Sequence, residues 1–516
     1  MRHRTPRATS AIPRGAARLL LIELRRNAMP WILPLIAALF WFDSYRPSTG
    51  TAQLYVLRTF WNMGQGHTII DFGPFVAGVA AWMGSRDGRR GLADLVTATA
   101  RPRWAAQLAT WAATAIWAVA AYLVFVGVMF AVYAHQGVGG TPPWWWVAVG
   151  ATAVTAFSAA GFAVGAWWPS RFAAPVAAFG GFLAMAMSSQ TGFRSPSGWA
   201  LILPTNSNGN FDQTDSGIFY PWLPDLPIAR IMFLAGIAVA ALGLTGLPAR
   251  AGGPWLRRAA AVVTLAAVAS AGTAAGLASN ARLSAHGMVI PALHDAANDA
   301  PITYTPACGR AAGVPVCLNP AYRRWLPDVN AALAPVLAEV AGLPGAPART
   351  TQVAGAYSSA EGGAGQAVTI SGRPPVLRMP LGTLNLPGPC GFCDGPVTAA
   401  QFAAQLRLLS VHAFVGAGNG AGTPAQQAVQ AALLQGAGIP FAAQPRVLDA
   451  YGMQASWALA TGNGQVRGSN GPGPATGPVY AAARRFAALP AATRHAWLAS
   501  HLAALRAGHL TLAQLP

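Results

Sequence analysis

The chain has 516 residues, 53% of them hydrophobic and only 9% charged, with a formal net charge of +19 at pH 7. Soluble domains carry about a quarter charged residues, so this composition indicates a membrane protein. All 34 basic residues are arginine. Without a lysine the chain cannot form the P-loop of an ATPase. Nucleic-acid binding is not expected either, because the arginines cluster beside apolar segments and no binding motif accompanies them.

The segment Arg14–Pro30 reads RGAARLLLIELRRNAMP, in which arginines and one glutamate flank a run of leucines. This pattern predicts an amphipathic helix that lies in the lipid headgroup plane, and Pro30 would end it. The alternative is an arginine-rich flank whose only role is to orient the chain.

Seven apolar stretches follow, each close to the roughly 20 residues that cross a bilayer. They cover residues 29–43, 69–84, 108–133, 145–168, 172–189, 227–247 and 259–280. Arginines are far more frequent on one side of these stretches than on the other, which predicts a cytoplasmic N-terminus in a multi-pass plasma-membrane protein. The stretches hold almost no ionisable residue, which argues against a proton-coupled or ion-coupled carrier. The candidates are Asp71 at the start of the second stretch and His67 just before it, and an interfacial pair is the favoured interpretation of both.

The cytoplasmic connection between the second and third stretches reads SRDGRRGLADLVTATARPRW from Ser85 to Trp104. Charged residues come first, a short apolar face follows, and a basic turn closes the segment. A short helix of this kind outside the bilayer can dock into a groove of a partner protein.

The N-terminal helix and this connection together resemble the ABC-2 type permease family, over about the first half of the chain. Its members begin with an interfacial elbow helix, and their first cytoplasmic loop is the coupling helix that contacts an ATPase subunit. The resemblance implies a permease subunit of an ABC-type exporter, which pairs with a second permease as a homo- or heterodimer in membrane lipid. It assigns the contact with the ATPase to Asp87, Arg89, Arg90, Leu92, Leu95 and Arg103. The family commonly has six spans, whereas the seventh here leads into an appended domain.

Three parts are therefore expected: a cytoplasmic N-terminus with the elbow helix (1–28), a transmembrane permease domain (29–282) and an extracytoplasmic soluble domain (283–516). Between spans five and six, residues 190–226 are expected to form an outer loop that caps the mouth of the bundle. Beyond residue 283, short segments separated by Pro and Gly predict an α+β fold. The predicted helices are 322–340, 399–415 and 424–434, with one or two more over 480–507, and the predicted strands are 366–370 and 376–379.

All four cysteines, Cys308, Cys317, Cys390 and Cys393, fall in the predicted outer domain. Thiols oxidise outside the cell, so two disulfides are expected. Of the three possible pairings we favour the two local ones, 308 with 317 and 390 with 393. A zinc site and a redox Cys-x-x-Cys motif remain alternatives.

A peptidase was also considered, because Leu409–Val415 (LSVHAFV) resembles part of a metal-binding helix. The glutamate after His412 and a second histidine four residues on are both missing, so the HExxH motif is absent. No catalytic residue, metal or cofactor is expected, and the chain is not predicted to be an enzyme by itself. Two rivals to the transporter remain: a membrane-anchored outer binding or sensory module that does not transport and, less favoured, a peptidase-like enzyme.

Overall fold

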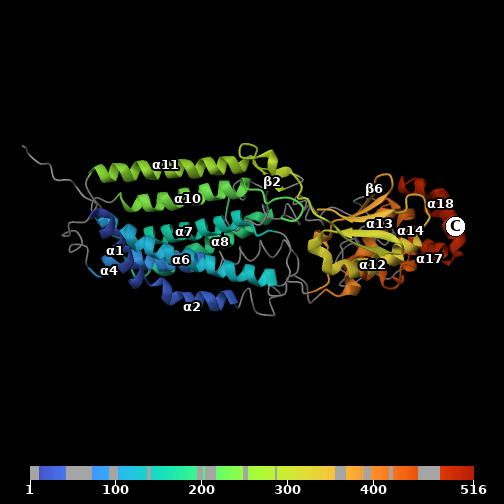
Figure 1. Ribbon diagram of the computed structural model, residues 1–516, viewed down its shortest axis with the longest axis horizontal. Coiled ribbons are helices and arrows are strands. Elements are labelled where there is room, and N and C mark those ends of the chain that lie inside the picture. Colours follow the sequence, from blue (N-terminus) through green and yellow to red (C-terminus); the bar gives the residue numbers. More distant parts are fainter. Residues whose placement is uncertain are drawn as a thin grey trace, which may run out of the picture.

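The structure is a computed structural model that describes residues 11–41, 72–91, 103–135, 141–194, 202–203, 217–247, 254–284, 287–354, 368–384, 386–388, 397–417, 422–450 and 477–516. It is mostly helical, with one small mixed sheet. Figure 1 shows an elongated molecule in which a bundle of long helices from the first half is followed, end to end, by a smaller mixed part from the second half. We call these two regions the bundle and the C-terminal part.

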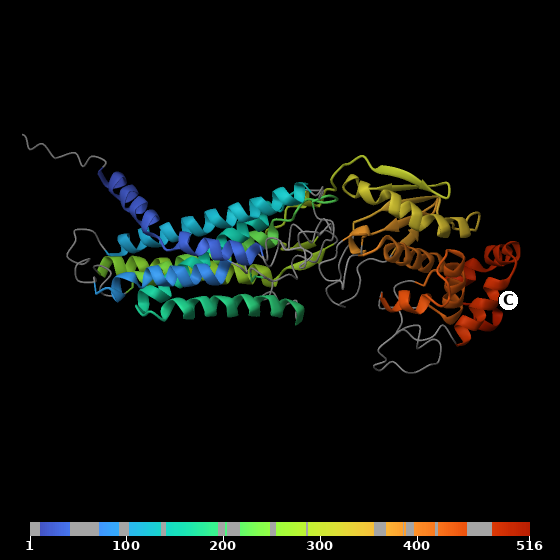
Figure 2. The same cartoon turned by 90° about the horizontal axis from the view of Figure 1, so that it is seen from below.

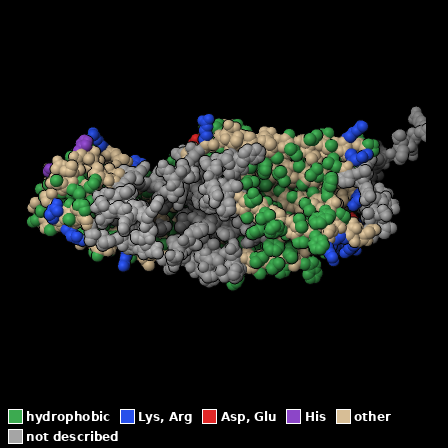
Figure 3. Space-filling model, turned by 180° about the vertical axis from the view of Figure 1, so that it is seen from behind, with side chains coloured by type: hydrophobic (Ala, Val, Ile, Leu, Met, Phe, Trp, Pro, Cys, Tyr) green, Lys and Arg blue, Asp and Glu red, His purple; other side chains and the backbone are tan. Residues whose placement is uncertain are grey.

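Each of the seven predicted apolar stretches contains a helix. Four of these helices are long and apolar enough to cross a membrane: α6 (Arg103–His135), α7 (Trp144–Trp167), α10 (Asp225–Thr245) and α11 (Pro254–Ser279). The other three apolar helices are shorter over the part that is described: α2 (Met29–Phe40), the helix Phe72–Gly84 and residues Ala173–Met187 of α8 (Ala173–Arg194). Figure 3 shows the surface that suits such a bundle, with a broad hydrophobic face and arginines toward its ends.

Small residues bring two of these helices close together. Gly161 and Gly165 of α7 lie against the backbone of Ala77 and Ala81 in the helix Phe72–Gly84, where an added Cβ would clash with carbonyl oxygens. Gly180 of α8, by contrast, has open space beside it. The Gly161–Gly165 pair therefore has a packing role of the kind that spacing four apart permits between membrane helices.

The C-terminal part is built on a five-stranded sheet in the order β3-β4-β5-β7-β6. The strands are β3 (Ala307–Ala311), β4 (Val314–Leu318), β5 (Arg349–Gln352), β7 (Val376–Met379) and β6 (Thr369–Ser371). The two central pairings, β4 with β5 and β5 with β7, are parallel, and the outer two are antiparallel. Inward-facing residues such as Val316, Leu377 and Met379 share one core with Leu333 of α12 (Leu326–Glu339) and Phe402 of α13 (Ala399–Val415).

The remaining helices form a second core beyond the sheet. They are α14 (Pro424–Gly436), α15 (Gln444–Ala450), α17 (Pro478–Ala488) and α18 (Ala491–Arg506). Residues 399–415 are a helix over the predicted bounds, begun by a capping box in which Thr398 and Gln401 satisfy each other's backbone N–H groups. The segment predicted as one or two helices from residue 480 is two, separated at Pro490, and the predicted helix 322–340 begins as the short 3-10 helix η6 (Pro320–Trp325).

The bundle and the C-terminal part exchange apolar side chains where they meet. Ile218 and Phe219, from the loop before α10, are buried in the core of the C-terminal sheet. Ile290, just after the hairpin of β1 (Arg282–Ser284) and β2 (Gly287–Val289), is buried in the core of the bundle. The described end of the predicted outer loop thus packs into the C-terminal part. This contact is a second link between the two regions, in addition to the covalent connection between α11 and β1.

Candidate functional site

The predicted elbow and coupling segments meet at the end of the bundle farthest from the C-terminal part. The elbow prediction corresponds to α1 (Ala11–Arg26), which leaves the bundle at an angle (Figure 2). The first turn of the coupling segment is α4 (Arg86–Arg89), a single helical turn. Leu21 and Ile22 of α1 are exposed beside arginines, as expected of a helix that lies among lipid headgroups.

An ion pair joins these two elements. The guanidinium of Arg86 donates two hydrogen bonds of 3.0 Å, one to each carboxylate oxygen of Glu23 on α1. Both side chains are largely buried, and Asp87 lies 3.5 Å from the same guanidinium. The hydrogen bonds to Glu23 are the main cause that raises the pKa of Arg86 above its usual value, against the opposing effect of burial. A two-bond contact of this geometry is strong and directional.

The end of α1 is also fixed to α6 by buried polar contacts. Asn27 donates to the Thr114 hydroxyl at 2.8 Å and accepts from the Met29 N–H at 2.9 Å. Trp117 donates its indole N–H to the Leu24 carbonyl at 3.0 Å. The bond from the Met29 N–H and the bond to the Leu24 carbonyl satisfy backbone groups at the break between α1 and α2. The elbow is therefore held to two different elements of the bundle.

The arginines that follow Arg86 take different positions. Arg89 turns back over the ring of Trp82, 3.4 Å from its centroid, and donates to the Trp82 carbonyl at 3.0 Å. Burial and the neighbouring charge of Arg90 lower the pKa of Arg89. Arg90 is exposed at the end of α4, and Asp87 is half-buried. Of the predicted contact residues in this turn, Arg90 is thus the one that is open to a partner.

The other predicted contact residues are Leu92, Leu95 and Arg103. Leu92 and Leu95 lie outside the described residues, as do His67 and Asp71. Arg103 is the first residue of α6, half-buried, and its Nε has no hydrogen-bond partner within the described part of the chain. The structure therefore brings Asp87, Arg89 and Arg90 together in one turn.

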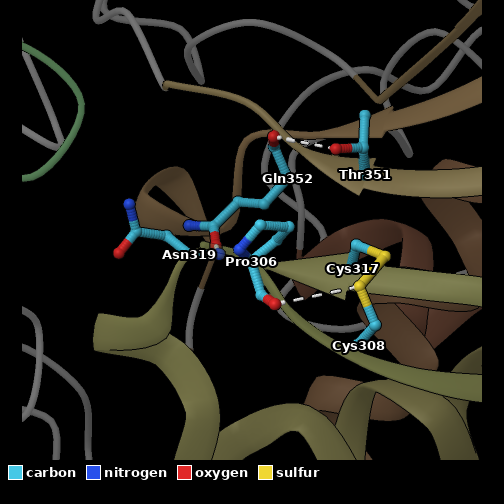
Figure 4. Close-up of a disulfide and its surroundings, with 6 residues drawn as sticks. All are labelled: Pro306, Cys308, Cys317, Asn319, Thr351 and Gln352. Atoms are coloured by element: carbon cyan, nitrogen blue, oxygen red, sulfur yellow. Dashed lines mark hydrogen bonds between the residues drawn. A yellow bond between two sulfur atoms is a disulfide. The ribbon is translucent and has the colours of Figure 1, made fainter. Parts of the chain in front are cut away.

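The structure describes one of the two predicted cysteine pairs. Cys308 and Cys317 are directly opposite each other on β3 and β4 and form a disulfide, as predicted (Figure 4). Cys390 and Cys393 lie outside the described residues. His412, considered above for a metal helix, is buried and hydrogen-bonded to Gln430 of α14 at 3.1 Å. Among the residues that the structure describes, no group of three or more His, Cys, Asp or Glu side chains could hold a metal ion.

Two buried charged residues were missed in the sequence. Asp225 and Arg230 are both fully buried on α10, close to the C-terminal part. The predicted apolar stretch 227–247 begins after Asp225, which leaves this residue in the predicted loop, and Arg230 lies inside the stretch.

Comparison with family models, with curated proteins and with solved structures finds no match for the chain.

Proposed function

We propose that the chain is the permease subunit of an ABC-type exporter of the ABC-2 kind, and that a separate ATPase subunit binds the segment 86–103. The observation that carries this proposal is the two-bond contact between Glu23 and Arg86. It links the helix before the first apolar helix to the turn after the second one. A movement of that turn would therefore displace α1, instead of only bending a loose connection.

In this proposal all seven apolar helices cross the membrane, the N-terminus is cytoplasmic, and residues after about 283 are outside. The ATPase would press on the segment 86–103 when it closes on ATP. Arg86 would pass the displacement to α1 through Glu23, and the contacts of Asn27 and Trp117 would pass it to α6. A second permease would complete the pathway, as the resemblance to the family implies.

The proposal gives distinct roles to the residues of the turn. Arg90 is exposed and would contact the ATPase directly, with Leu92 and Leu95 supplying the apolar face. Arg89 would hold α4 against the preceding helix through Trp82.

Copurification tests the proposal. The tagged full chain, purified in mild detergent from its own host, should bring down a P-loop ATPase. Arg90→Glu, or Leu92→Asp with Leu95→Asp, should abolish this, since each changes only the predicted contact surface. Arg446→Glu is the matched control, because Arg446 is also exposed but lies on α15 in the C-terminal part. Retention of the ATPase by all contact variants would contradict the assigned surface.

A wild-type chain that brings down no ATPase would instead favour the membrane-anchored binding or sensory module. The orientation has its own test. Cys308 is exposed, so after reduction it should react with a membrane-impermeant thiol reagent in intact cells. Labelling only after lysis would place the C-terminal part inside and remove the basis for an exporter of this orientation.

A further inference from the structure

A chain of three titratable side chains connects the bundle to the start of the C-terminal part. Asp225, the first residue of α10, accepts a hydrogen bond from the Ile290 N–H at 3.0 Å through Oδ2. The same oxygen lies 3.1 Å from Nδ1 of His294. Nε2 of His294 lies 3.1 Å from Oδ2 of Asp299, in the short helix η5 (Ala296–Asp299). One imidazole thus bridges two carboxylates from different segments.

The two carboxylates differ in their access to water. The side chain of Asp225 is 0% exposed, and its Oδ1 has no hydrogen-bond partner among the described residues. The side chain of Asp299 is 39% exposed, although its Oδ1, like that of Asp225, is buried and has no hydrogen-bond partner among the described residues. His294 lies between them at 16% exposure. The chain of contacts therefore runs from the protein surface to a carboxylate that is not exposed to solvent.

Among the described residues, the charged groups at hydrogen-bond distance from the imidazole are the two carboxylates. Asp299 comes from η5, whereas the carboxylate of its N-cap residue Asp295 is occupied by the Ala297 N–H. From α10 comes Asp225, while the guanidinium of Arg230 lies over the ring of Trp146. The hairpin contributes the exposed Arg282 on β1 and no ionisable residue on β2. The hydrogen bond to Asp299 is the largest cause that raises the pKa of His294, followed, against the opposing effect of burial, by the charge of Asp225.

We propose that Asp225, His294 and Asp299 form a proton-operated latch, which fastens the start of the C-terminal part to α10 while His294 is protonated. A protonated imidazole has two N–H donors and can give one to each carboxylate. A neutral imidazole has one donor, so a lone pair would face a carboxylate on its other side. This goes beyond the proposed transport function, because it holds whether or not the bundle transports.

The difference in exposure decides which contact opens. Asp225 cannot turn to water, so the remaining proton stays on Nδ1 and keeps that carboxylate paired, since a buried charge without a partner is unfavourable. Asp299 can turn to water and releases Nε2. Loss of the proton therefore frees η5, while Ile290 stays bound to Asp225 and the Ile302 N–H stays bonded to the Phe219 carbonyl.

The direction of the pH effect follows from the raised pKa. The latch is fully fastened below the ordinary pKa of histidine, and it opens as the pH rises through the raised pKa of His294 in the folded protein. If the C-terminal part lies outside, as proposed above, the latch responds to the external pH.

Hydrogen exchange of the full chain in detergent, from about pH 6 to about pH 9, tests the latch. Peptides covering 295–302 should exchange about three to five times faster at high pH, after normalisation to α12, because a half-exposed charged contact is lost. The Ile290 amide should keep its protection. Asp299→Asn should move the change to lower pH, and His294→Gln should abolish it.

His509→Gln is the matched control, because His509 is exposed and follows α18. This variant should retain the full pH dependence of exchange in 295–302. Should His294→Gln fail to fold, Asp299→Asn at the surface still decides the matter. The latch would be overturned if the protection of 295–302 in the wild type did not depend on pH, or if its pH dependence persisted in His294→Gln. An equal loss of protection in α12 would overturn it as well. None of these outcomes depends on whether an ATPase binds.

Discussion

At each end of the bundle a buried carboxylate is bonded to a basic side chain, but the basic side chain differs between the two ends. At one end Glu23 is held by Arg86, and at the other Asp225 is held by His294. The partners are 63 and 69 residues apart in the chain. Arginine keeps its proton at any physiological pH, whereas histidine titrates near neutrality. The first contact is therefore permanent, and the second is conditional.

The surroundings of the two contacts reinforce this difference. Both oxygens of Glu23 are bonded to Arg86, and Asn27 and Trp117 fix the same region of α1. Oδ1 of Asp225 is buried and has no hydrogen-bond partner in the part of the chain that the structure describes. Breaking the first contact should thus affect the protein at every pH, while the second should matter only over a limited range. Four predictions test this comparison, from the largest expected effect to the smallest.

Phe219→Ala should have the largest effect, because it removes an aromatic side chain from the core where the bundle loop enters the C-terminal part. Truncation of a buried phenylalanine destabilises proteins by about 3–5 kcal/mol. The loss of stability can be measured by chemical unfolding of the full chain, followed through amide hydrogen exchange in α12. Phe172→Ala is the control, since Phe172 is 55% exposed on the bundle surface. Equal effects of the two variants would mean that the loop does not hold the C-terminal part.

Glu23→Gln should weaken the permanent contact. Removing one partner of a fully buried ion pair costs about 3–5 kcal/mol, and partial exposure of Arg86 should reduce this to about 2 kcal/mol. Arg86→Lys keeps the charge but loses the paired geometry, so a smaller loss is expected. Thermal unfolding at several pH values measures both, and the exposed Arg25→Gln serves as control. A loss that varied between pH 6 and pH 9 would argue against a permanent fastening.

Gly161→Ala, on α7, should disturb the neighbouring helix Phe72–Gly84, which is followed directly by α4 and Arg86. The added Cβ would press on the backbone of Ala77, and overpacking of this kind costs about 1–2 kcal/mol. Gly180→Ala is matched in chemistry but has open space around it, so it should stabilise α8 by up to about 1 kcal/mol through helix propensity. The opposite signs should appear as opposite shifts in thermal unfolding. A destabilising Gly180→Ala would indicate a contact at that face.

Local patterns predicted much of this fold. The run of leucines among arginines located α1, the apolar stretches located the bundle helices, and the helix predicted over 399–415 matches the bounds of α13. The local pairing of Cys308 with Cys317 was predicted, and the disulfide is there, between two strands that were not predicted. These features depend on residues close together in the chain, which is the range over which periodicity and capping act.

The contacts that define the candidate sites are not local, and periodicity carries no information on them. Nothing in the sequence pairs Glu23 with Arg86, or Asp225 with His294. Strands β3, β4 and β5 were missed because ACGRA, VPVCL and RTTQ are short and lack a clear alternation of apolar and polar residues. Ile218 and Phe219 sit in a loop rich in turn-forming residues, so their burial depends wholly on the partner core.

The smallest effect should be the pH dependence of stability at the conditional contact. The pKa of His294 is raised in the folded protein, chiefly by the hydrogen bond to Asp299, so its stabilisation is present at low pH and is lost as the pH rises through that pKa. Since Asp299 is 39% exposed, the loss should stay under about 1 kcal/mol. Unfolding of wild type, His294→Gln and Glu23→Gln at about pH 6 and about pH 9 separates the two ends. Glu23→Gln should keep the wild-type pH step despite its lower stability, and His294→Gln should lose the step. If Glu23→Gln removed the step as well, the two ends would be energetically coupled through the bundle, because sites this far apart normally contribute independently.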